Sequence, residues 1–409
     1  MRLVPTCRKS IVTFRFRWDT ERVTEPAGQG DPEGNHALLS LSLLEPVADA
    51  AMTYFYGQLF AMDAEIAAMF PAALDSQRRR FFYALRRIAQ GQDDPAALAR
   101  FLERLGRAHR KNGIRDKHFA VFRRALLATM RQFCGNGWTE AAEAAWAAAF
   151  DHAAQVMIDA ARSEPGPAWW ISTVVRTEAR TPGIAVLTLQ PDQPLCFLPG
   201  QHVSVQTLHW PRLWRTYSIA NAPRPDGTIT LHVRATEGGM VSHALVHHVR
   251  AGDPLVLGAP AGSMVADVTS RRDVLCLAGG TGLAPVKAII EAIITTPFSG
   301  NGRHREIALY VGARRQRDLY DLAALRDMEL SYPWLQVLPA ISAEPAGAAL
   351  ARDVLPGTIP QLAAKASWPG RDIYISGPDE MIRKTVRILT GLGAPRDRMH
   401  YDLPAEDPP

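Results

Sequence analysis

The sequence predicts a multidomain fold: an all-helical domain, then an antiparallel β-barrel, then an α/β domain built on a parallel sheet. Three observations predict this order. Residues 37–163 are rich in Ala, Leu, Arg and Glu, and their apolar residues recur at helical spacing. Residues 167–265 hold short strand-like runs separated by glycine and proline turns. In residues 271–402, apolar runs alternate with helical stretches, which is typical of a parallel sheet.

The composition is that of an ordinary globular protein. The 409 residues are 47% hydrophobic and 21% charged, with a formal net charge of +5. Apolar runs are too short for a membrane span, and the basic pairs are not interleaved with aromatics, so we expect no membrane span and no nucleic-acid partner. The four cysteines lie far apart, which favours a reducing cytoplasm. We expect a cytoplasmic monomer or homodimer, with a loose N-terminal extension over 1–36 and a tail over 403–409.

Capping signals mark where helices of the first domain begin. Asp94 and Pro95 suit the N-cap and the first residue of one helix. Thr139 suits the N-cap of the last helix. A Pro/Gly stretch, "RSEPGPAWW", then predicts a linker to the barrel.

His109 continues the apolar stripe of a predicted helix. That stripe consists of Leu98, Phe101, Leu102 and Leu105. A core hydrogen bond satisfies most inward-facing histidines, so His109 alone does not identify a metal ligand. Tyr56, Phe70 and Gln77, however, point toward the same apolar space from other predicted helices. A nitrogen ligand, a flat aromatic ring and two polar groups together make up what a haem pocket needs.

The helical domain resembles a bacterial globin of the kind found at the front of flavohaemoglobins. "YFYGQLFAMDAEIAAMFP" resembles that family's second-helix motif, and "WTEAAEAAWAAAF" resembles its last helix. The resemblance implies that His109 is the proximal iron ligand of a haem b. It also implies that Tyr56 and Gln77 are the distal polar residues and that Phe70 packs on the porphyrin.

Two departures from the family lie behind the proximal histidine. The family usually has a tyrosine and a glutamate that polarise this histidine, and here they fall at Phe119 and Ser163, with Glu164 adjacent. The lysine usual before the histidine is Ala108. Because such partners set ligand basicity, their loss bears on how readily the iron pushes electron density into bound oxygen.

Two motifs in the barrel, "PGQHV" and "RTYSIANAP", suit a flavin. Arg215 can meet a pyrophosphate with two charge-assisted hydrogen bonds, Tyr217 offers a flat ring to the isoalloxazine, and Ser218 can bond its edge. The FAD-binding residues predicted from these motifs are Gln201, His202, Arg215, Thr216, Tyr217 and Ser218. "EGGMVSHALVHH" follows as a glycine turn and a helix start that suit a phosphate, and adds Gly239, Val241 and Ser242.

The last domain carries two motifs that suit a nicotinamide nucleotide. "VLCLAGGTGLAPVKAII" is a strand, a glycine turn and a helix, and predicts contacts from Gly280, Thr281, Gly282 and Pro285. "YISGPDEM" ends a later strand and predicts contacts from Gly377 and Pro378 at the edge where open α/β sheets bind ligands. Residues 167–402 thus resemble the ferredoxin-reductase family. Ser376 replaces that family's cysteine, and Leu403 lies near where flavohaemoglobins usually have a phenylalanine that stacks on the flavin.

The choice between NADH and NADPH stays open. "YVGARRQRDLY" places Arg314, Arg315 and Arg317 where a 2′-phosphate could bind, which argues for NADPH. NADH users of this family also carry arginine in this loop, so the balance leans slightly to NADH.

The resemblance implies an NAD(P)H-dependent nitric oxide dioxygenase, which passes electrons through FAD to a haem, binds O₂ and oxidises nitric oxide to nitrate. Two alternatives stay open. With Phe119 and Ser163 in place of the polarising pair, the protein could be a haem-based oxygen or redox sensor, or a different oxidase. It could also be a haem-free flavin reductase that serves a partner oxygenase or a ferric chelate.

Overall fold

The computed structural model describes residues 36–91, 93–296, 304–343 and 353–403. The predicted N-terminal extension lies outside these residues except for His36, and the predicted tail lies outside them except for Leu403. The chain divides into two compact units. One, the helical unit, comprises residues up to Arg107 together with Ile114–Glu164; the other, the reductase unit, comprises Ala108–Gly113 and all residues from Pro165 onward.

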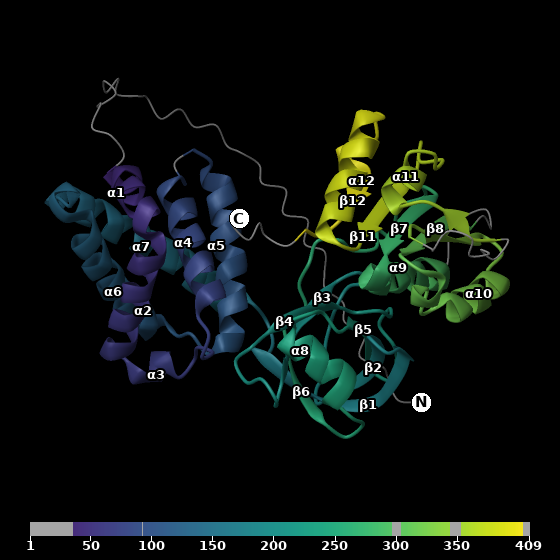
Figure 1. The fold of residues 1–409 in the computed structure, drawn as a ribbon, viewed down its shortest axis with the longest axis horizontal. Helices are drawn as coiled ribbons and strands as arrows, with labels where there is room; N and C mark the ends of the chain where they lie inside the picture. Colours follow the sequence, from purple (N-terminus) through teal and green to yellow (C-terminus); the bar gives the residue numbers. More distant parts are fainter. Residues whose placement is uncertain (1–35, 92, 297–303, 344–352, 404–409) are drawn as a thin grey trace. The chain divides into compact units, whose positions relative to one another are not determined.

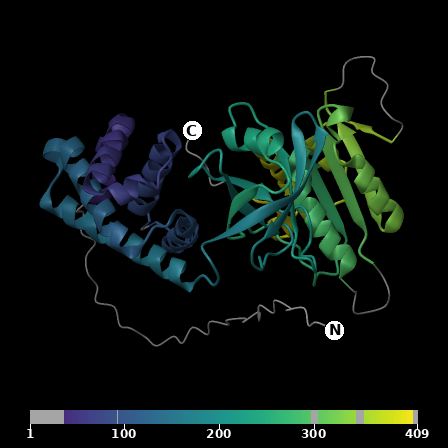
Figure 2. The same ribbon diagram turned by 90° about the horizontal axis from the view of Figure 1, so that it is seen from below.

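The helical unit is a bundle, drawn in purple and blue in Figure 1 and seen after a 90° turn in Figure 2. Its helices, taken to their full length, are α1 (His36–Leu44), α2 (Ala48–Met62), α3 (Ala64–Ala67), α4 (Asp75–Ala89), α5 (Pro95–His109), α6 (Asp116–Cys134) and α7 (Glu140–Ser163). Both predicted caps are confirmed. The Ala97 N–H donates to Asp94 Oδ1 at 2.8 Å, and the Ala142 N–H donates to Thr139 Oγ1 at 3.1 Å.

The core of the helical unit is aromatic and aliphatic. Its largest fully buried side chains include Phe55, Met130 and Trp146, from α2, α6 and α7. Helices α5 and α7 cross closely at Gly106, because a Cβ added there would overlap the backbone of Met157. This close crossing fixes α5, the helix that ends at His109.

The barrel of the reductase unit is antiparallel, as predicted. Its strands are β1 (Trp169–Thr181), β2 (Ile184–Pro191), β3 (His202–Thr207), β4 (Arg215–Ser218), β5 (Ile229–Arg234) and β6 (Pro254–Gly258). They are ordered β4-β3-β6-β1-β2-β5, and a bridge between Ile219 and Leu231 joins the two edge strands. The sheet is therefore nearly closed around a core of alternating inward residues, such as Val203, Val205, Leu231 and Val233.

The α/β part has a six-stranded parallel sheet, also as predicted. Its strands are β7 (Val274–Gly279), β8 (Ile307–Ala313), β9 (Leu335–Ile341), β10 (Leu355–Pro356), β11 (Asp372–Ser376) and β12 (Met399–His400). Helices α9 (Leu283–Thr295) and α10 (Leu322–Ser331) cover one face, and α11 (Ile359–Ala363) and α12 (Asp379–Gly391) cover the other (Figure 1).

The order of the parallel strands is β10-β9-β8-β7-β11-β12. Chain order therefore runs outward from β7 in one direction and from β11 in the other, so the sheet has a switch point between β7 and β11. Ligands of open α/β sheets bind at the carboxyl ends of the strands at such a point. Across the described residues, every helix is too short or too polar to cross a membrane.

Candidate functional site

Three of the predicted haem-pocket residues lie together in the helical unit. Tyr56 is 4% exposed, and its hydroxyl donates to the main-chain oxygen of Gln77 at 3.3 Å. The ring of Tyr56 meets the ring of Phe70 edge-on, with centroids 5.4 Å apart. Burial raises the pKa of Tyr56 well above its ordinary value, so the hydroxyl keeps its proton and can donate.

His109 is the last residue of α5 and is partly buried. On its helix, Leu102 is fully buried, whereas Leu98, Phe101 and Leu105 pack around it and keep part of their surface exposed. Partly exposed apolar residues on α4 and α6 pack against the buried clusters in the same way, namely Phe81, Ile88, Phe119 and Phe122. Apolar walls with surface left to bury, and one buried hydroxyl donor, are the chemistry that a large flat apolar group such as haem requires.

The residues at the family's polarising positions do not supply a polar pair. Phe119 has an apolar side chain that packs beside Leu102. The hydroxyl of Ser163 donates to the carbonyl of Ala160 at 3.1 Å, within its own helix. The adjacent Glu164 is paired with Arg107, whose Nε lies 3.2 Å from a carboxylate oxygen.

The two predicted flavin motifs lie side by side in the barrel. Strands β3 and β4 pair so that His202 lies opposite Ser218 and Val203 lies opposite Tyr217. Burial raises the pKa of Tyr217 to about 12, which keeps its hydroxyl neutral. Thr216 and Arg215 are exposed on the same strand, and the Arg215 guanidinium donates to the carbonyl of Trp214 at 2.9 Å.

The other predicted flavin residues hold turns together. Gln201 Oε1 accepts the N–H of Leu198 at 2.9 Å, so this oxygen stabilises the turn before β3. Ser242 donates to the carbonyl of Gly239 at 2.9 Å, and Val241 is buried in the barrel core. A Cβ on Gly239 would overlap Thr236 Oγ1, so a larger residue here would displace the Thr236 side chain. These residues shape the turn that follows β5.

The two predicted nucleotide loops meet at the switch point. A Cβ added at Gly282, in the loop after β7, would lie 2.5 Å from the Cα of Gly377, in the loop after β11. Gly377 has a φ of +156° and Gly280 a φ of +55°. Thr281 is partly exposed beside them and Pro378 is exposed, whereas Pro285 is buried in the first turn of α9. The loops are therefore held together by backbone contact that only glycine allows.

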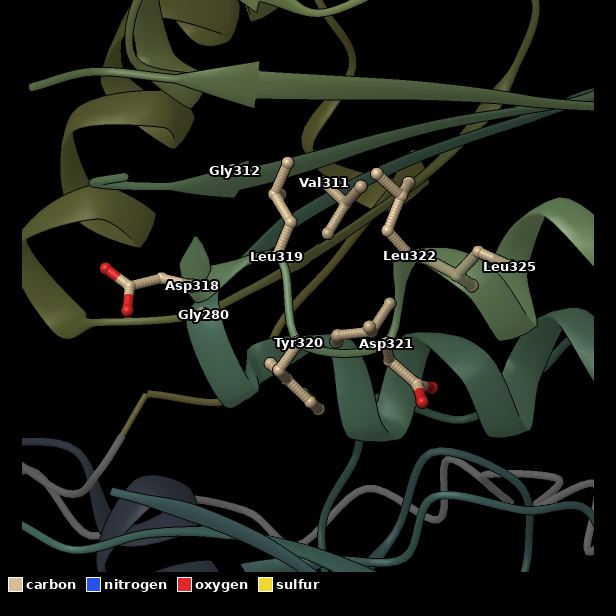
Figure 3. A pocket seen from close by; sticks show the side chains of 10 residues that line it. Gly280, Val311, Gly312, Asp318, Leu319, Tyr320, Asp321, Leu322 and Leu325 are labelled. Atoms are coloured by element: carbon tan, nitrogen blue, oxygen red, sulfur yellow. The ribbon is translucent and has the colours of Figure 1, made fainter. Parts of the chain in front are cut away.

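A small pocket adjoins these loops at the carboxyl ends of β7 and β8 (Figure 3). Its lining residues are Gly280, Leu283, Val311, Gly312, Asp318, Leu319, Tyr320, Asp321, Leu322 and Leu325. Arg314, Arg315 and Arg317 are exposed on the segment between β8 and this pocket. The sequence does not identify three of these residues, Asp318, Tyr320 and Asp321, as part of the site. No local pattern shows that they lie beside Gly280.

Another residue missed from the sequence lies near the chain's end. Asp402 Oδ1 accepts hydrogen bonds from Ser263 N–H at 3.0 Å and from Ser263 Oγ at 2.7 Å. Its other carboxylate oxygen lies 3.9 Å from Nδ1 of His202. These contacts hold the C-terminal segment beside the "PGQHV" motif. The segment includes Leu403, which lies near the position of the family's C-terminal phenylalanine.

Comparison with known families assigns three regions of the chain. Residues 53–157 match the globin family, residues 176–265 the oxidoreductase FAD-binding domain, and residues 276–387 the oxidoreductase NAD-binding domain. The globin match argues against the alternative that the protein is a haem-free flavin reductase.

Relatives resemble the whole chain or its reductase part. A flavohemoprotein of Bordetella pertussis is 27% identical over 389 residues, covering 88% of this chain and 94% of the relative. The ferredoxin–NAD(P)⁺ reductase component of a naphthalene 1,2-dioxygenase system of Pseudomonas putida is 32% identical over 234 residues, covering 56% of this chain and 67% of the relative. A flavohemoglobin structure from Malassezia yamatoensis, 15% identical, superposes with a TM-score of 0.69 over 90% of this chain and 98% of that one, which shows a shared fold.

These findings define the class of protein as a globin domain joined to an FAD- and NAD-binding oxidoreductase module. Together with the flavohemoprotein relatives, which match 88% of the chain, these domains support a flavohaemoglobin. Its cofactors are accordingly a haem, FAD, and NADH or NADPH.

Proposed function

We propose that this flavohaemoglobin is an NAD(P)H-dependent nitric oxide dioxygenase, which uses O₂ and electrons from a nicotinamide nucleotide to convert nitric oxide to nitrate. The observation that carries the proposal is the cluster of Tyr56, Phe70 and Gln77, on a chain that also carries its own reductase unit. Nitric oxide as the substrate is taken from the resemblance to the family.

When bound, the three cofactors would supply the redox chemistry: hydride from the nicotinamide, its release from FAD as two single electrons and a proton, and gas binding at the haem iron. The protein supplies the binding, the orientation and the charge stabilisation. In this proposal His109 would hold the iron, and Phe70 would pack on the porphyrin.

Tyr56 is suited to stabilise negative charge on a bound ligand. Its hydroxyl is buried and protonated, and its bond to the Gln77 carbonyl is long at 3.3 Å. A long hydrogen bond is weak, so the hydroxyl can exchange it for a ligand oxygen at little cost. A donor already placed in an apolar site stabilises developing negative charge strongly. Gln77 would add a second polar group from α4.

In the reductase unit, Arg215 would bind the FAD pyrophosphate, and Tyr217 and Ser218 would contact the flavin ring. The guanidinium of Arg215 is exposed and pairs with no acidic side chain among the described residues, and Arg215 lies on the strand next to that of His202. The paired loops at Gly282 and Gly377 would bring backbone against the nicotinamide nucleotide, and Arg314 would lie toward its adenosine end.

The direct test is nitric oxide consumption by the purified protein in air. We expect NADH-dependent consumption with nitrate as the product and loss of consumption when O₂ is removed. Consumption that does not require the nucleotide, or that yields no nitrate, would overturn the proposal.

One observation favours a second function, a haem-based oxygen or redox sensor. Phe119 carries no polar atom, Ser163 bonds within its own helix, and Glu164 is paired with Arg107. A proximal histidine without the family's polarising pair would give the iron less electron density. Repeated additions of nitric oxide to the oxygenated protein in excess NADH separate the two functions, because a dioxygenase consumes each addition at the same rate, whereas a sensor consumes about one equivalent per haem and then stops.

A further inference from the structure

A buried hydrogen bond joins the barrel to the α/β part of the reductase unit. His232, on strand β5, is 5% exposed, and its Nδ1 lies 2.7 Å from the hydroxyl oxygen of Tyr320. The two rings meet edge-on, with centroids 5.5 Å apart. Burial lowers the pKa of His232 to about 4, so the imidazole is neutral near neutral pH and the bond joins two uncharged groups.

Asp321, which follows Tyr320 in the chain, forms a second buried contact between the α/β part and the barrel. Its side chain is 1% exposed, and Lys287 Nζ, on α9, donates to one carboxylate oxygen at 2.7 Å. The other oxygen forms no hydrogen bond and lies 3.7 Å from a guanidinium nitrogen of Arg180, on barrel strand β1. Tyr320 and Asp321 together therefore hold one loop against two strands of the barrel.

Such a cluster is a costly way to add stability. A buried carboxylate with one unbonded oxygen loses much of its hydration, and well-packed apolar residues often stabilise such a position equally well. In some proteins, buried polar groups of this kind fix the geometry of neighbouring elements. The position of this cluster indicates which geometry it fixes.

The loop lies beside the nucleotide site. Leu319 and Leu322 point toward the sheet, whereas Tyr320 and Asp321 point away from it (Figure 3). The same segment begins with the exposed Arg314 and lines the pocket with Gly280.

The barrel strand that carries His232 also reaches the nucleotide site. Arg234 is two residues after His232, and its guanidinium would lie 3.5 Å from a Cβ on Gly280. The strand then continues into the turn that Thr236 and Ser242 form. The bond between His232 and Tyr320 thus lies between the nucleotide loops and the strand that leads to the flavin turn.

We propose that Tyr320 is a positioning residue for hydride transfer: its bond to His232 sets how closely the nucleotide loops approach the flavin barrel. Hydride transfer needs the reacting atoms within about 3.5 Å, and a misplacement of about 1 Å can cost roughly 100-fold in rate. This inference rests on the reductase half of the proposed function and is independent of its nitric oxide step.

The test uses the full-length protein with bound FAD, under argon. Tyr320→Phe removes only the hydroxyl, and rapid mixing with NADH follows the bleaching of the flavin. We expect the limiting rate per bound FAD to fall about tenfold while the half-saturating NADH concentration changes less than twofold. NADH carrying deuterium at the transferred position should show a larger isotope effect in the variant, because hydride transfer then limits the rate more completely.

His232→Gln and the double variant complete the test. Residues that act through one bond have non-additive effects, so the double variant should be no slower than the slower single variant. Tyr332→Phe, at the residue that follows α10 and packs against Trp334, is the matched control and should leave the rate unchanged. An unchanged limiting rate and isotope effect in Tyr320→Phe, or independent multiplying effects in the double variant, would overturn the proposal. Neither result depends on nitric oxide consumption, so the two proposals fail separately.

Discussion

The helical unit and the reductase unit build their candidate sites in different ways. In the helical unit the site consists of side chains: Tyr56 lies on α2, Gln77 on α4, and Phe70 on the turn that follows α3. In the reductase unit the site consists of main-chain atoms, because the two nucleotide loops pack against each other through their backbones at Gly282 and Gly377. A side-chain site can change its chemistry while the fold survives, whereas a backbone site cannot change without disturbing the packing. The departures from the family follow this difference, because all four are side-chain changes, Phe119 and Ser163 in the helical unit and Ser376 and Leu403 in the reductase unit, whereas the glycines of the nucleotide loops are kept.

The largest expected effect tests the side-chain site. His109→Ala should abolish haem binding, seen as loss of the Soret absorption band, because the substitution removes the nitrogen that would hold the iron. The reductase unit should still bleach its flavin with NADH. The control is His152→Ala, an exposed histidine on α7, which should keep the full Soret band. A band that survives His109→Ala unchanged would show that another group holds the iron.

A single added methyl group at the nucleotide loops should have the second-largest effect, on the rate of flavin reduction. In Gly282→Ala the new Cβ would lie 2.5 Å from the Cα of Gly377, so the two loops must separate. We expect flavin reduction by NADH to slow roughly 100-fold, since displacing a nucleotide loop by about 1 Å costs this much. Gly391→Ala is the control, because a Cβ there meets nothing within 4 Å. Equal rates for both variants would disprove the close approach.

Acid should weaken the reductase unit through His232. Burial lowers the pKa of this histidine from 6.5 to about 4, while the nearby Asp321 opposes the shift and Lys287 and Arg180 add to it. The unfolded chain therefore binds a proton that the folded chain does not, and stability is full above about pH 6.5 and falls as the pH drops toward 4. Between pH 7 and pH 5 the loss should be on the order of 2 kcal/mol. Denaturant unfolding followed by flavin fluorescence measures it, and His232→Gln should flatten the curve; an equally steep curve in that variant would contradict this origin.

The smallest effect expected is in the distal pocket. Tyr56→Phe keeps the ring and removes the hydroxyl, so nitric oxide consumption should fall roughly tenfold, which corresponds to one hydrogen bond to a charged acceptor. Flavin reduction by NADH should not change. Tyr54→Phe, on the same helix, provides a matched comparison because Tyr54 packs against Phe133, away from this cluster. Equal consumption by the two variants would remove Tyr56 from the site.

The local structure could be predicted from the sequence more fully than the contacts between distant segments. The caps at Asp94 and Thr139 follow from short-range patterns, and both are confirmed. The bond between His232 and Tyr320 joins residues 88 positions apart. Nothing in either segment indicates the other, because their meeting depends on how the barrel and the parallel sheet pack.

The candidate site residues also differ in how far their sequence predicts their contacts. The glycine loops were predicted because tight turns between strands and helices have recognisable sequences, and their meeting follows from the switch point of the sheet. The contacts of Gln201, Val241 and Pro285 within the protein were not predictable, because a motif does not tell which of its members hold the turn. Gln201 bonds within its own turn, and Val241 and Pro285 are buried.

The central claim is that electrons enter at the nucleotide loops, cross the flavin and reach a haem in the helical unit. An absorption spectrum of the purified protein, before and after NADH is added under argon, tests it most directly. The account predicts a Soret band at the start, followed by bleaching of the flavin and a shift of the haem bands to those of the ferrous state. A flavin that bleaches while the haem bands stay in place, or a protein that shows flavin absorption alone, would contradict it.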